Sequence, residues 1–284
     1  MDREFLIGVE VNSKEITAGL VDLSGKIVKR ITIPTELSKG KKVVVDNIAA
    51  VINKIKKNKI LGVGVALPGV VNREKGIVVD SPFPGWNGLY LKKMIEDQVL
   101  CPVFIENEGK CFAIAEYKCG TFRKTENAIS VFFNDTISSG LVIDCKVAKG
   151  AGCAAGLVGS LIVDNKQGKL EDFASPASIE RLFKAKTKKS KSIYEIVLME
   201  NDKAAKEILK AAGIHFGTSM SHLVTALNPE LVIVGGPLAR SEPFLAAAES
   251  TLLAKSSELS RKSVKLIGSK MNDSAILGAA SIII

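Results

Sequence analysis

Residues 5–28 read FLIGVEVNSKEITAGLVDLSGKIV, and residues 128–147 read AISVFFNDTISSGLVIDCKV. Each stretch opens with an apolar, β-branched run, passes through a polar loop and returns in a Gly-Leu-Val run, which predicts two strands joined by a turn. The second stretch begins about 120 residues after the first. A pattern repeated at that distance predicts a duplicated α/β architecture of two lobes with a central cleft between them.

The segments around this repeat supply further strands and helices. Apolar residues at helical spacing predict helices over 43–56, 109–117, 178–185 and 203–228. Apolar runs bounded by turn residues predict strands over 27–34, 60–67, 103–106 and 231–235. A final helix is expected over 273–280, with Asp273 placed to cap it.

The composition of the chain is that of an ordinary globular protein. The 284 residues are 46% hydrophobic and 24% charged, which excludes disordered, collagenous and coiled-coil classes. No apolar run approaches the roughly 20 residues of a membrane helix, and the acidic Asp2 and Glu4 are unlike a signal peptide. The five cysteines have no CxxC spacing. We therefore expect a cytoplasmic protein with reduced, mostly buried thiols and no membrane partner.

The net charge of +9 raises the question of a nucleic-acid partner. Lysines gather at residues 38–42, 54–59 and 184–191. The three tyrosines and the single tryptophan do not alternate with them as stacking platforms would require. We interpret the clusters as solvated lysine faces and do not expect a nucleic-acid partner.

Six motifs follow one another along the chain: GVALPGVVN (64–72), PGWNG (84–88), VFIENE (103–108), KGAGCAAG (149–156), LEDFAS (170–175) and LNPELVIVGG (227–236). This ordered set resembles the ROK family (repressors, open reading frames and sugar kinases) of the actin/hexokinase-like ATPase superfamily. The resemblance implies an actin-like (ribonuclease H-like) fold with lobes at 1–118 and 119–284, the last helix packing back on the first lobe. It also implies ATP-dependent phosphorylation of a hexose or amino sugar with Mg²⁺, and a homodimer. Because the chain begins at the first strand, its layout resembles the kinase branch rather than the DNA-binding repressors.

Two loops correspond to the phosphate-binding loops of the family, where glycine lets backbone N–H groups approach an anion closely. The first, residues 10–15, lacks both glycines, although Glu10 keeps a carboxylate and Lys14 can attract phosphate. An ordinary hairpin turn is the alternative for this loop. The second, residues 134–140, keeps one glycine at its end. The nucleotide contacts implied in the second loop are Ser138, Ser139 and Gly140.

The catalytic position of the family is an Asn-Asp pair, in which the aspartate accepts the proton of the attacking sugar hydroxyl. This chain has Asn107-Glu108. Glutamate keeps the charge and moves the carboxylate one methylene outward, and a misplacement of about 1 Å can cost roughly 10²-fold in rate. Glu108 is thus either a weakened base or only a ligand contact. Asn107 is expected to bond a sugar hydroxyl.

The sequence departs most clearly from the family at its zinc motif. Family members carry a histidine after a Gly-Glu-x-Gly element and a cysteine-rich loop, whereas this chain reads GLVGS at 156–160 and has neither residue type between Ser160 and Ser175. Structural zinc needs four N or S ligands, so no zinc is expected. Leu157 and Ser160 also replace the sugar-contacting Glu and His, and each lost partner costs about 1–3 kcal/mol. The sugar contacts that the resemblance still implies are Asn87, Asn107, Glu108 and Glu171.

The Gly235-Gly236 turn matches the adenosine-side turn of the family and is implied to contact nucleotide, although a Gly-Gly pair can simply end a buried strand. Two functions stay open. The broken phosphate loops and lost sugar contacts favour a degraded kinase that binds a small molecule such as a sugar, or has a regulatory role. The alternative is an active, glucokinase-like enzyme that uses ATP and Mg²⁺, with Glu108 as its base.

Overall fold

The computed structural model describes residues 4–57, 59–121, 123, 125–163 and 168–284. The chain forms two compact units. Unit 1 comprises Met1–Arg123, Val147–Ala155 and Met271–Ile284, and unit 2 comprises Lys124–Lys146 and Gly156–Lys270. The division into lobes at residues 118 and 119 stays a prediction.

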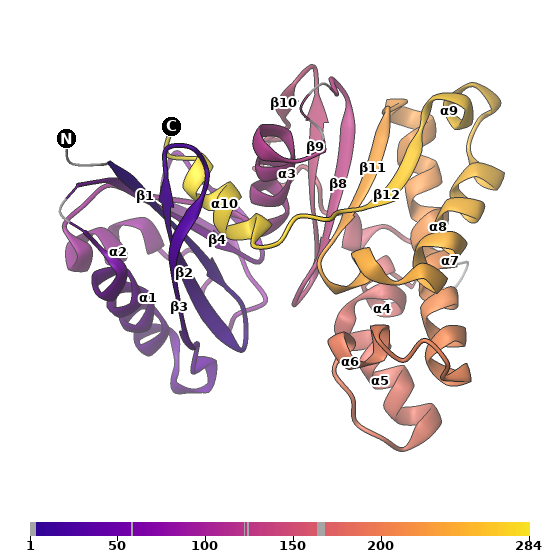
Figure 1. The fold of residues 1–284 in the computed structure, drawn as a ribbon, viewed down its shortest axis with the longest axis horizontal. Helices are drawn as coiled ribbons and strands as arrows, with labels where there is room; N and C mark the ends of the chain where they lie inside the picture. Colours follow the sequence, from indigo (N-terminus) through magenta and orange to yellow (C-terminus); the bar gives the residue numbers. More distant parts are fainter. Residues whose placement is uncertain (1–3, 58, 122, 124, 164–167) are drawn as a thin grey trace. The chain divides into compact units, whose positions relative to one another are not determined.

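Unit 1 is built on a five-stranded sheet with the order β3-β2-β1-β4-β7 (Figure 1). The three N-terminal strands are antiparallel, and β1, β4 and β7 run parallel. The strands are β1 (Phe5–Val11), β2 (Glu15–Asp22), β3 (Ile27–Pro34), β4 (Ile60–Leu67) and β7 (Val103–Asn107). A separate hairpin, β5 (Val70–Asn72) and β6 (Ile77–Asp80), follows β4.

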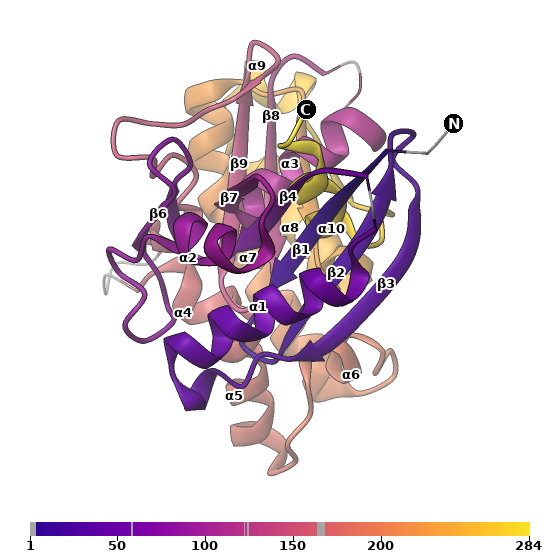
Figure 2. The same ribbon diagram turned by 90° about the vertical axis from the view of Figure 1, so that its left-hand side faces the viewer.

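Helices cover both faces of this sheet. The amphipathic helices α1 (Lys41–Ile55) and α2 (Leu91–Val99) bury their apolar residues against the face that carries Ile7 and Val9. Figure 2 shows α1 lying across the strands. Leu6 belongs to the opposite face and packs on α10 (Ser274–Ser281), which also contacts α3 (Glu108–Cys119).

Glycine allows α10 to lie directly on the strands beneath it. A Cβ atom at Gly8 would lie 2.0 Å from the carbonyl oxygen of Ile276, and one at Gly64 would lie 1.7 Å from that of Ala279. Neither strand position could therefore carry a side chain with α10 where it is.

The prediction that Asp273 caps the final helix is wrong. Asp273 stands at the N-cap position, but its φ of 53° is left-handed and its side chain makes no capping hydrogen bond. A capping residue ordinarily has an extended backbone that aims its side chain at the first helical N–H groups. The carboxylate instead forms an ion pair of 2.8 Å with Arg30 on β3.

Unit 2 repeats the sheet of unit 1. Its order is β10-β9-β8-β11-β12, with β8 antiparallel to β9 and parallel to β11, and β11 parallel to β12. This confirms the α/β class and the duplication predicted from the sequence. The strands are β8 (Ala128–Phe133), β9 (Ile137–Ile143), β10 (Lys146–Val147), β11 (Leu231–Gly235) and β12 (Lys265–Gly268).

The helices of unit 2 bury a core around Phe133, Phe216 and Phe244, whose ring centroids lie 5.4–5.5 Å apart. The long helix α7 packs against α8 and carries Phe216. The helices are α4 (Leu170–Ala174), α5 (Pro176–Thr187), α6 (Ile193–Val197), α7 (Lys203–Leu227), α8 (Glu242–Lys255) and α9 (Glu258–Ser263), with short 3₁₀ turns at Val158–Ser160 and Pro237–Arg240. A further 3₁₀ turn, Leu37–Lys39, belongs to unit 1.

The five cysteines are all in the described part of the chain, and none forms a disulfide. Cys111 and Cys153 are buried as predicted, whereas the same prediction is wrong for Cys119 and Cys145, which are exposed. Over the described residues, no helix has both the length and the apolar character needed to cross a membrane.

Candidate functional site

The first predicted phosphate loop is closed by its own asparagine. Asn12 follows β1, and its Oδ1 accepts the backbone N–H groups of Lys14 at 2.9 Å and Glu15 at 2.8 Å. The N–H of Asn12 donates to the carbonyl of Glu15 at 3.1 Å. This is an Asx turn within a β-hairpin, the alternative that the sequence left open for this loop. Glu10 is half-buried in β1, and Lys14 is exposed.

Thr35 holds this loop from the end of β3. The fully buried Thr35 donates its N–H to the carbonyl of Lys14 at 3.0 Å and its hydroxyl to the carbonyl of Asn12 at 2.7 Å. The loop is therefore bonded both within itself and to the neighbouring strand.

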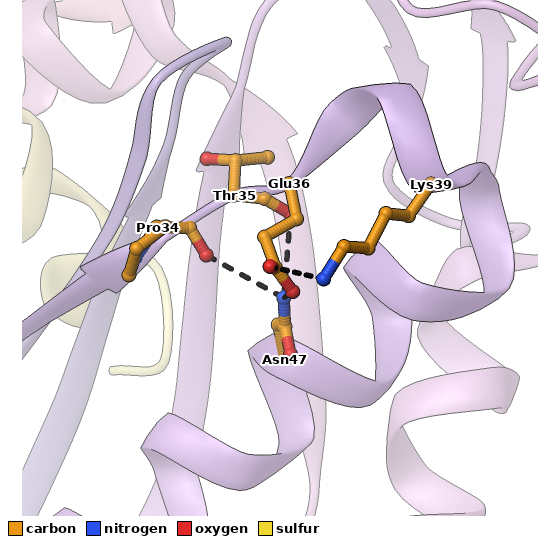
Figure 3. A network of polar contacts seen from close by, with 5 residues as sticks. All are labelled: Pro34, Thr35, Glu36, Lys39 and Asn47. Carbon is orange, nitrogen blue, oxygen red and sulfur yellow. Dashed lines mark hydrogen bonds and ion pairs between the residues drawn. The ribbon is translucent and has the colours of Figure 1, made fainter.

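A polar network fixes the chain around Thr35 (Figure 3). The amide of Asn47, on α1, donates to the carbonyls of Pro34 and Thr35 and to the carboxylate of Glu36, each at 3.4 Å. Lys39 pairs with Glu36 at 2.5 Å. This network connects the first loop to α1.

Asn107 and Glu108 stand where β7 ends and α3 begins. The Oδ1 of Asn107 caps the helix by accepting the N–H of Lys110 at 3.1 Å, and its Nδ2 donates to the carbonyl of Gly69 at 2.7 Å. Glu108 is the first residue of α3 and is fully buried. A carboxylate in the first turn of a helix is stabilised by the N-terminal end of the helix dipole.

Asn87 lies near the same glycine. Its Nδ2 donates to the carboxylate of Asp80 and its Oδ1 accepts the N–H of Ser81, both at 2.9 Å. The carbonyl of Asp80 packs so closely on Gly69 that a Cβ there would lie 2.2 Å from it.

Four predicted site residues of unit 1 therefore lie at the carboxyl-terminal edge of its sheet: Glu10, Asn87, Asn107 and Glu108. Across the parallel strands Glu10 is paired with Ala66, and Leu67 with Asn107, so Glu10 and the Asn107-Glu108 pair lie at the carboxyl ends of neighbouring strands. Asn87 joins them through Gly69. Crevices outside the carboxyl ends of parallel strands are where open α/β sheets bind ligands.

In unit 2 the second predicted phosphate loop is bonded to the segments beside it. Ser138 and Ser139 are buried, and the hydroxyl of Ser139 donates to the carbonyl of Gly156 at 2.8 Å. The N–H of Gly140 donates to the hydroxyl of Ser130 at 3.2 Å across the hairpin. These polar groups are bonded within the β8–β9 hairpin and to Gly156.

Glu171, predicted to contact sugar, reaches this loop from α4. Its Oε2 accepts the backbone N–H of Ile137 at 2.9 Å. Burial raises the pKa of the carboxyl group, and the hydrogen bond from Ile137 opposes that shift. A Cβ at Gly159 would lie 2.5 Å from the same oxygen. Leu157 and Ser160, which stand where the family has its sugar-contacting Glu and His, are both exposed.

The Gly235-Gly236 turn lies beside the second loop. Gly235 is paired with Phe132, and Gly236 has a φ of 78° with the carbonyl of Phe133 so close that a Cβ would lie 2.0 Å from it. Only glycine fits both the backbone conformation and this contact. The predicted residues of unit 2 therefore share one edge of its sheet.

Sequence reasoning missed Glu106 and Lys110, two charged side chains that are almost fully buried. Glu106 accepts the N–H of Asn107 at 2.8 Å, and burial raises its pKa. The alternation of β7 was the available signal, because it directs Phe104 and Glu106 to the face opposite Asn107.

Within residues 4–57, 59–121, 123, 125–163 and 168–284, no group of three or more His, Cys, Asp or Glu side chains can hold a metal ion. Residues 164–167 of the loop that corresponds to the family's zinc site lie outside the described residues. The absence of zinc stays a prediction.

Comparison with known proteins agrees with these observations. The ROK family model matches residues 6–284. The chain is 28% identical to a glucokinase from Thermotoga maritima, over 98% of this chain and 96% of that one, and 26% identical to the xylose repressor of Bacillus subtilis, over 99% and 77%. Its fold is similar to the Streptomyces griseus ROK glucokinase in complex with glucose and AMPPNP (TM-score 0.88, 22% identity, 98% of each chain). With the duplicated sheets and the family match along nearly its whole length, the chain belongs to the ROK family.

Proposed function

We propose that this protein is a sugar-binding ROK protein that has lost phosphate transfer from ATP. The observation that carries the proposal is that both loops implied to hold nucleotide phosphate are closed by side chains of the protein itself. Asn12 takes two N–H groups of the first loop, and Glu171 takes one N–H of the second.

The energetics support this proposal. A phosphate nest needs successive backbone N–H groups directed at the anion. A nucleotide would have to displace the side-chain oxygen of Asn12 from the N–H groups of Lys14 and Glu15. It would also have to displace the carboxylate of Glu171 from the N–H of Ile137. A hydrogen bond to a charged group contributes about 1.5–3 kcal/mol, so the bond made by Glu171 competes with phosphate on comparable terms. The residues present therefore fit ATP and Mg²⁺ poorly.

The polar residues at the sheet edges support a sugar as the ligand. In unit 1, the side-chain amides of Asn87 and Asn107 each use one donor and one acceptor position on the protein. An amide has two N–H donors and an oxygen with two lone pairs, so each can also bond a hydroxyl. Unit 2, considered by itself, offers the carboxylate of Glu171, of which one oxygen accepts from Ile137. The relatives include glucokinases and xylose repressors, which are named for a hexose and a pentose. A monosaccharide is the ligand class that these observations favour.

The decisive experiment is calorimetric titration of the purified full chain with glucose, mannose, N-acetylglucosamine and xylose, with and without MgATP, beside an assay of ADP release. We expect saturable binding of at least one sugar, weaker binding in Asn87→Ala and no sugar-dependent ADP release. Lys93→Gln is the control, because Lys93 is an exposed residue of α2 that pairs with Asp97 on the same helix. Absence of sugar binding in all conditions would overturn the proposal.

The competing function is an active ATP-dependent sugar kinase with Glu108 as base. It is favoured by the position of Glu108 directly after Asn107 and by the close packing of Gly236 on β8. Sugar-dependent ADP release that disappears in Glu108→Ala would establish this function instead. The family resemblance also implies a homodimer, which is tested separately by measuring the molar mass of the purified protein by light scattering.

A further inference from the structure

A second cavity, distinct from the sheet edge described above, lies within unit 1. Its volume is about 480 Å³, and it is bordered by the β5–β6 hairpin, α2, the edge strand β7, α3 and the segment 147–155. Apolar side chains, among them Val71, Phe104 and Ile114, form part of its wall. Its lining also carries four cationic and two anionic side chains: Arg73, Lys92, Lys110 and Lys149, with Glu74 and Glu106.

The buried cation of its lining is Lys110. Its side chain is on α3, only 5% of the residue is exposed, and its ammonium donates to the carbonyls of Cys153 at 2.8 Å and Lys149 at 3.5 Å. A protonated lysine has three N–H donors, so these two bonds do not exhaust it. The bonds also tie the segment 147–155 to α3.

Arg73 and Lys92 approach the cavity from two other elements. The guanidinium of Arg73 has five N–H donors, and one of them donates to the carbonyl of Ile282 at 2.5 Å. The ammonium of Lys92 lies 5.7 Å from the centre of the Phe104 ring and 3.8 Å from the carboxylate of Glu96. The hydrogen bonds of Arg73 and Lys110 described above go to neutral carbonyls, which leave their charges uncancelled.

Charge compensation inside the cavity is partial. Lys149 pairs with Glu74 at 2.6 Å, and Glu106 lies within electrostatic reach of both Lys110 and Arg73. Four cations against two carboxylates give the lining a formal charge of +2, and the pairing of Lys92 with Glu96 lowers this to +1. Lys110 is the buried cation of this lining, whereas Arg73 and Lys149 are exposed. A buried charge that is only partly compensated is costly, and an anion bound beside Lys110 reduces that cost.

We propose that this cavity binds the phosphate group of a small metabolite, held by Arg73 and Lys110, with the remainder of the molecule against Phe104 and Ile114. A volume of this size holds a small molecule, and the buried ammonium of Lys110 attracts an anion more strongly than it would in water. Glu106 and Asn107 are successive residues of β7 whose side chains point to opposite faces. The site is therefore separate from the proposed sugar contacts and does not rest on the proposed function.

The test is calorimetric titration of the full chain with inorganic phosphate, glycerol 3-phosphate and succinate. We expect both phosphates to bind and succinate, which carries two carboxylates and no phosphate, to bind more weakly. Higher affinity for glycerol 3-phosphate than for inorganic phosphate identifies a metabolite as the occupant, and equal affinities identify phosphate itself. No phosphate binding up to about 10 mM, above the usual range of metabolite affinities, or tighter binding of succinate, would overturn the proposal.

Two variants locate the site. Arg73→Gln should weaken phosphate binding about tenfold, the loss expected for one charge-assisted hydrogen bond. Lys92→Gln changes a partly exposed residue and keeps the test valid if Arg73→Gln does not fold. Lys93→Gln is the matched control, with the same charge change one residue along α2 and outside the cavity. Equal losses in Lys92→Gln and Lys93→Gln would overturn the proposed location.

Discussion

Glu171 and Ile137 are joined by a hydrogen bond of 2.9 Å, in which a buried carboxylate accepts the backbone N–H at the start of β9. The bond ties α4 to the second loop. Glu171 therefore has a structural role, and the family resemblance adds a sugar contact that stays a prediction.

Replacing Glu171 should separate these roles. In Glu171→Ala the Ile137 N–H loses its acceptor, and we expect the free energy of unfolding to fall by about 1–3 kcal/mol. Glu171→Gln keeps an acceptor oxygen of the same reach and should be at least as stable as the native chain at pH 7, because the neutral amide avoids the cost of a buried charge. Urea titrations of the three proteins measure the difference, and equal stability of the alanine variant would contradict the structural role.

The stability of the protein should depend on pH through Glu171. Burial raises its folded pKa above the ordinary 4.5, so the folded state holds the proton more tightly than the unfolded chain. Glu171 contributes its full stabilisation below about pH 4.5, and this contribution is lost as the pH rises through the raised pKa of the folded state. The pKa of Glu106 is also raised. The difference in unfolding free energy between the native protein and Glu171→Gln therefore isolates the effect of Glu171. A difference that stays constant from pH 4 to 8 would contradict the shift.

Opening the first loop should restore nucleotide affinity. Asn12→Gly removes the side chain that occupies the N–H groups of Lys14 and Glu15. We expect MgATP to bind about tenfold more tightly, the gain of one charge-assisted hydrogen bond. Asn53→Gly, on the exposed face of α1, is a control for a change of the same type away from the loop. Unchanged MgATP affinity in Asn12→Gly would show that Asn12 is not the barrier.

Gly236→Ala should destabilise unit 2. The substitution meets two costs, a φ of 78° and a Cβ placed 2.0 Å from the carbonyl of Phe133. Gly40→Ala is the matched comparison, because Gly40 has a φ of 90° with nothing within 4 Å of its Cβ position. Backbone strain of this kind costs about 1–3 kcal/mol, which both variants share, and the steric overlap should make Gly236→Ala clearly the less stable in thermal unfolding. Equal melting temperatures of Gly236→Ala and Gly40→Ala would contradict this expectation and would mean that the turn after β11 shifts to make room for the added Cβ.

The duplicated sheets could be predicted because strand-turn-strand patterns are local and occur twice. Helix α8 was not predicted, since its alanines and leucines do not form a single apolar stripe, and its burial depends on α7. The hairpin β5–β6 was missed because strands of three and four residues carry little alternation.

The site residues could be predicted by position and not by bonding. That Asn12 turns back onto its own loop, or that Glu171 accepts from Ile137, depends on side-chain directions that motifs do not encode. Asp273 illustrates the same limit, since an aspartate before a helix predicts a cap, and the competing partner, Arg30, is far away in the sequence.

Because residues 271–284 belong to unit 1, this unit is assembled from both ends of the chain. During synthesis, β1 and β4 are made long before α10 emerges to cover Gly8 and Gly64. At about 5–20 residues per second, the 161 residues between Arg123 and Ile284 take roughly 10–30 s. For that interval the face of β1 and β4 that α10 will cover lacks its helix, and the backbone at Gly8 and Gly64 is left uncovered on that side.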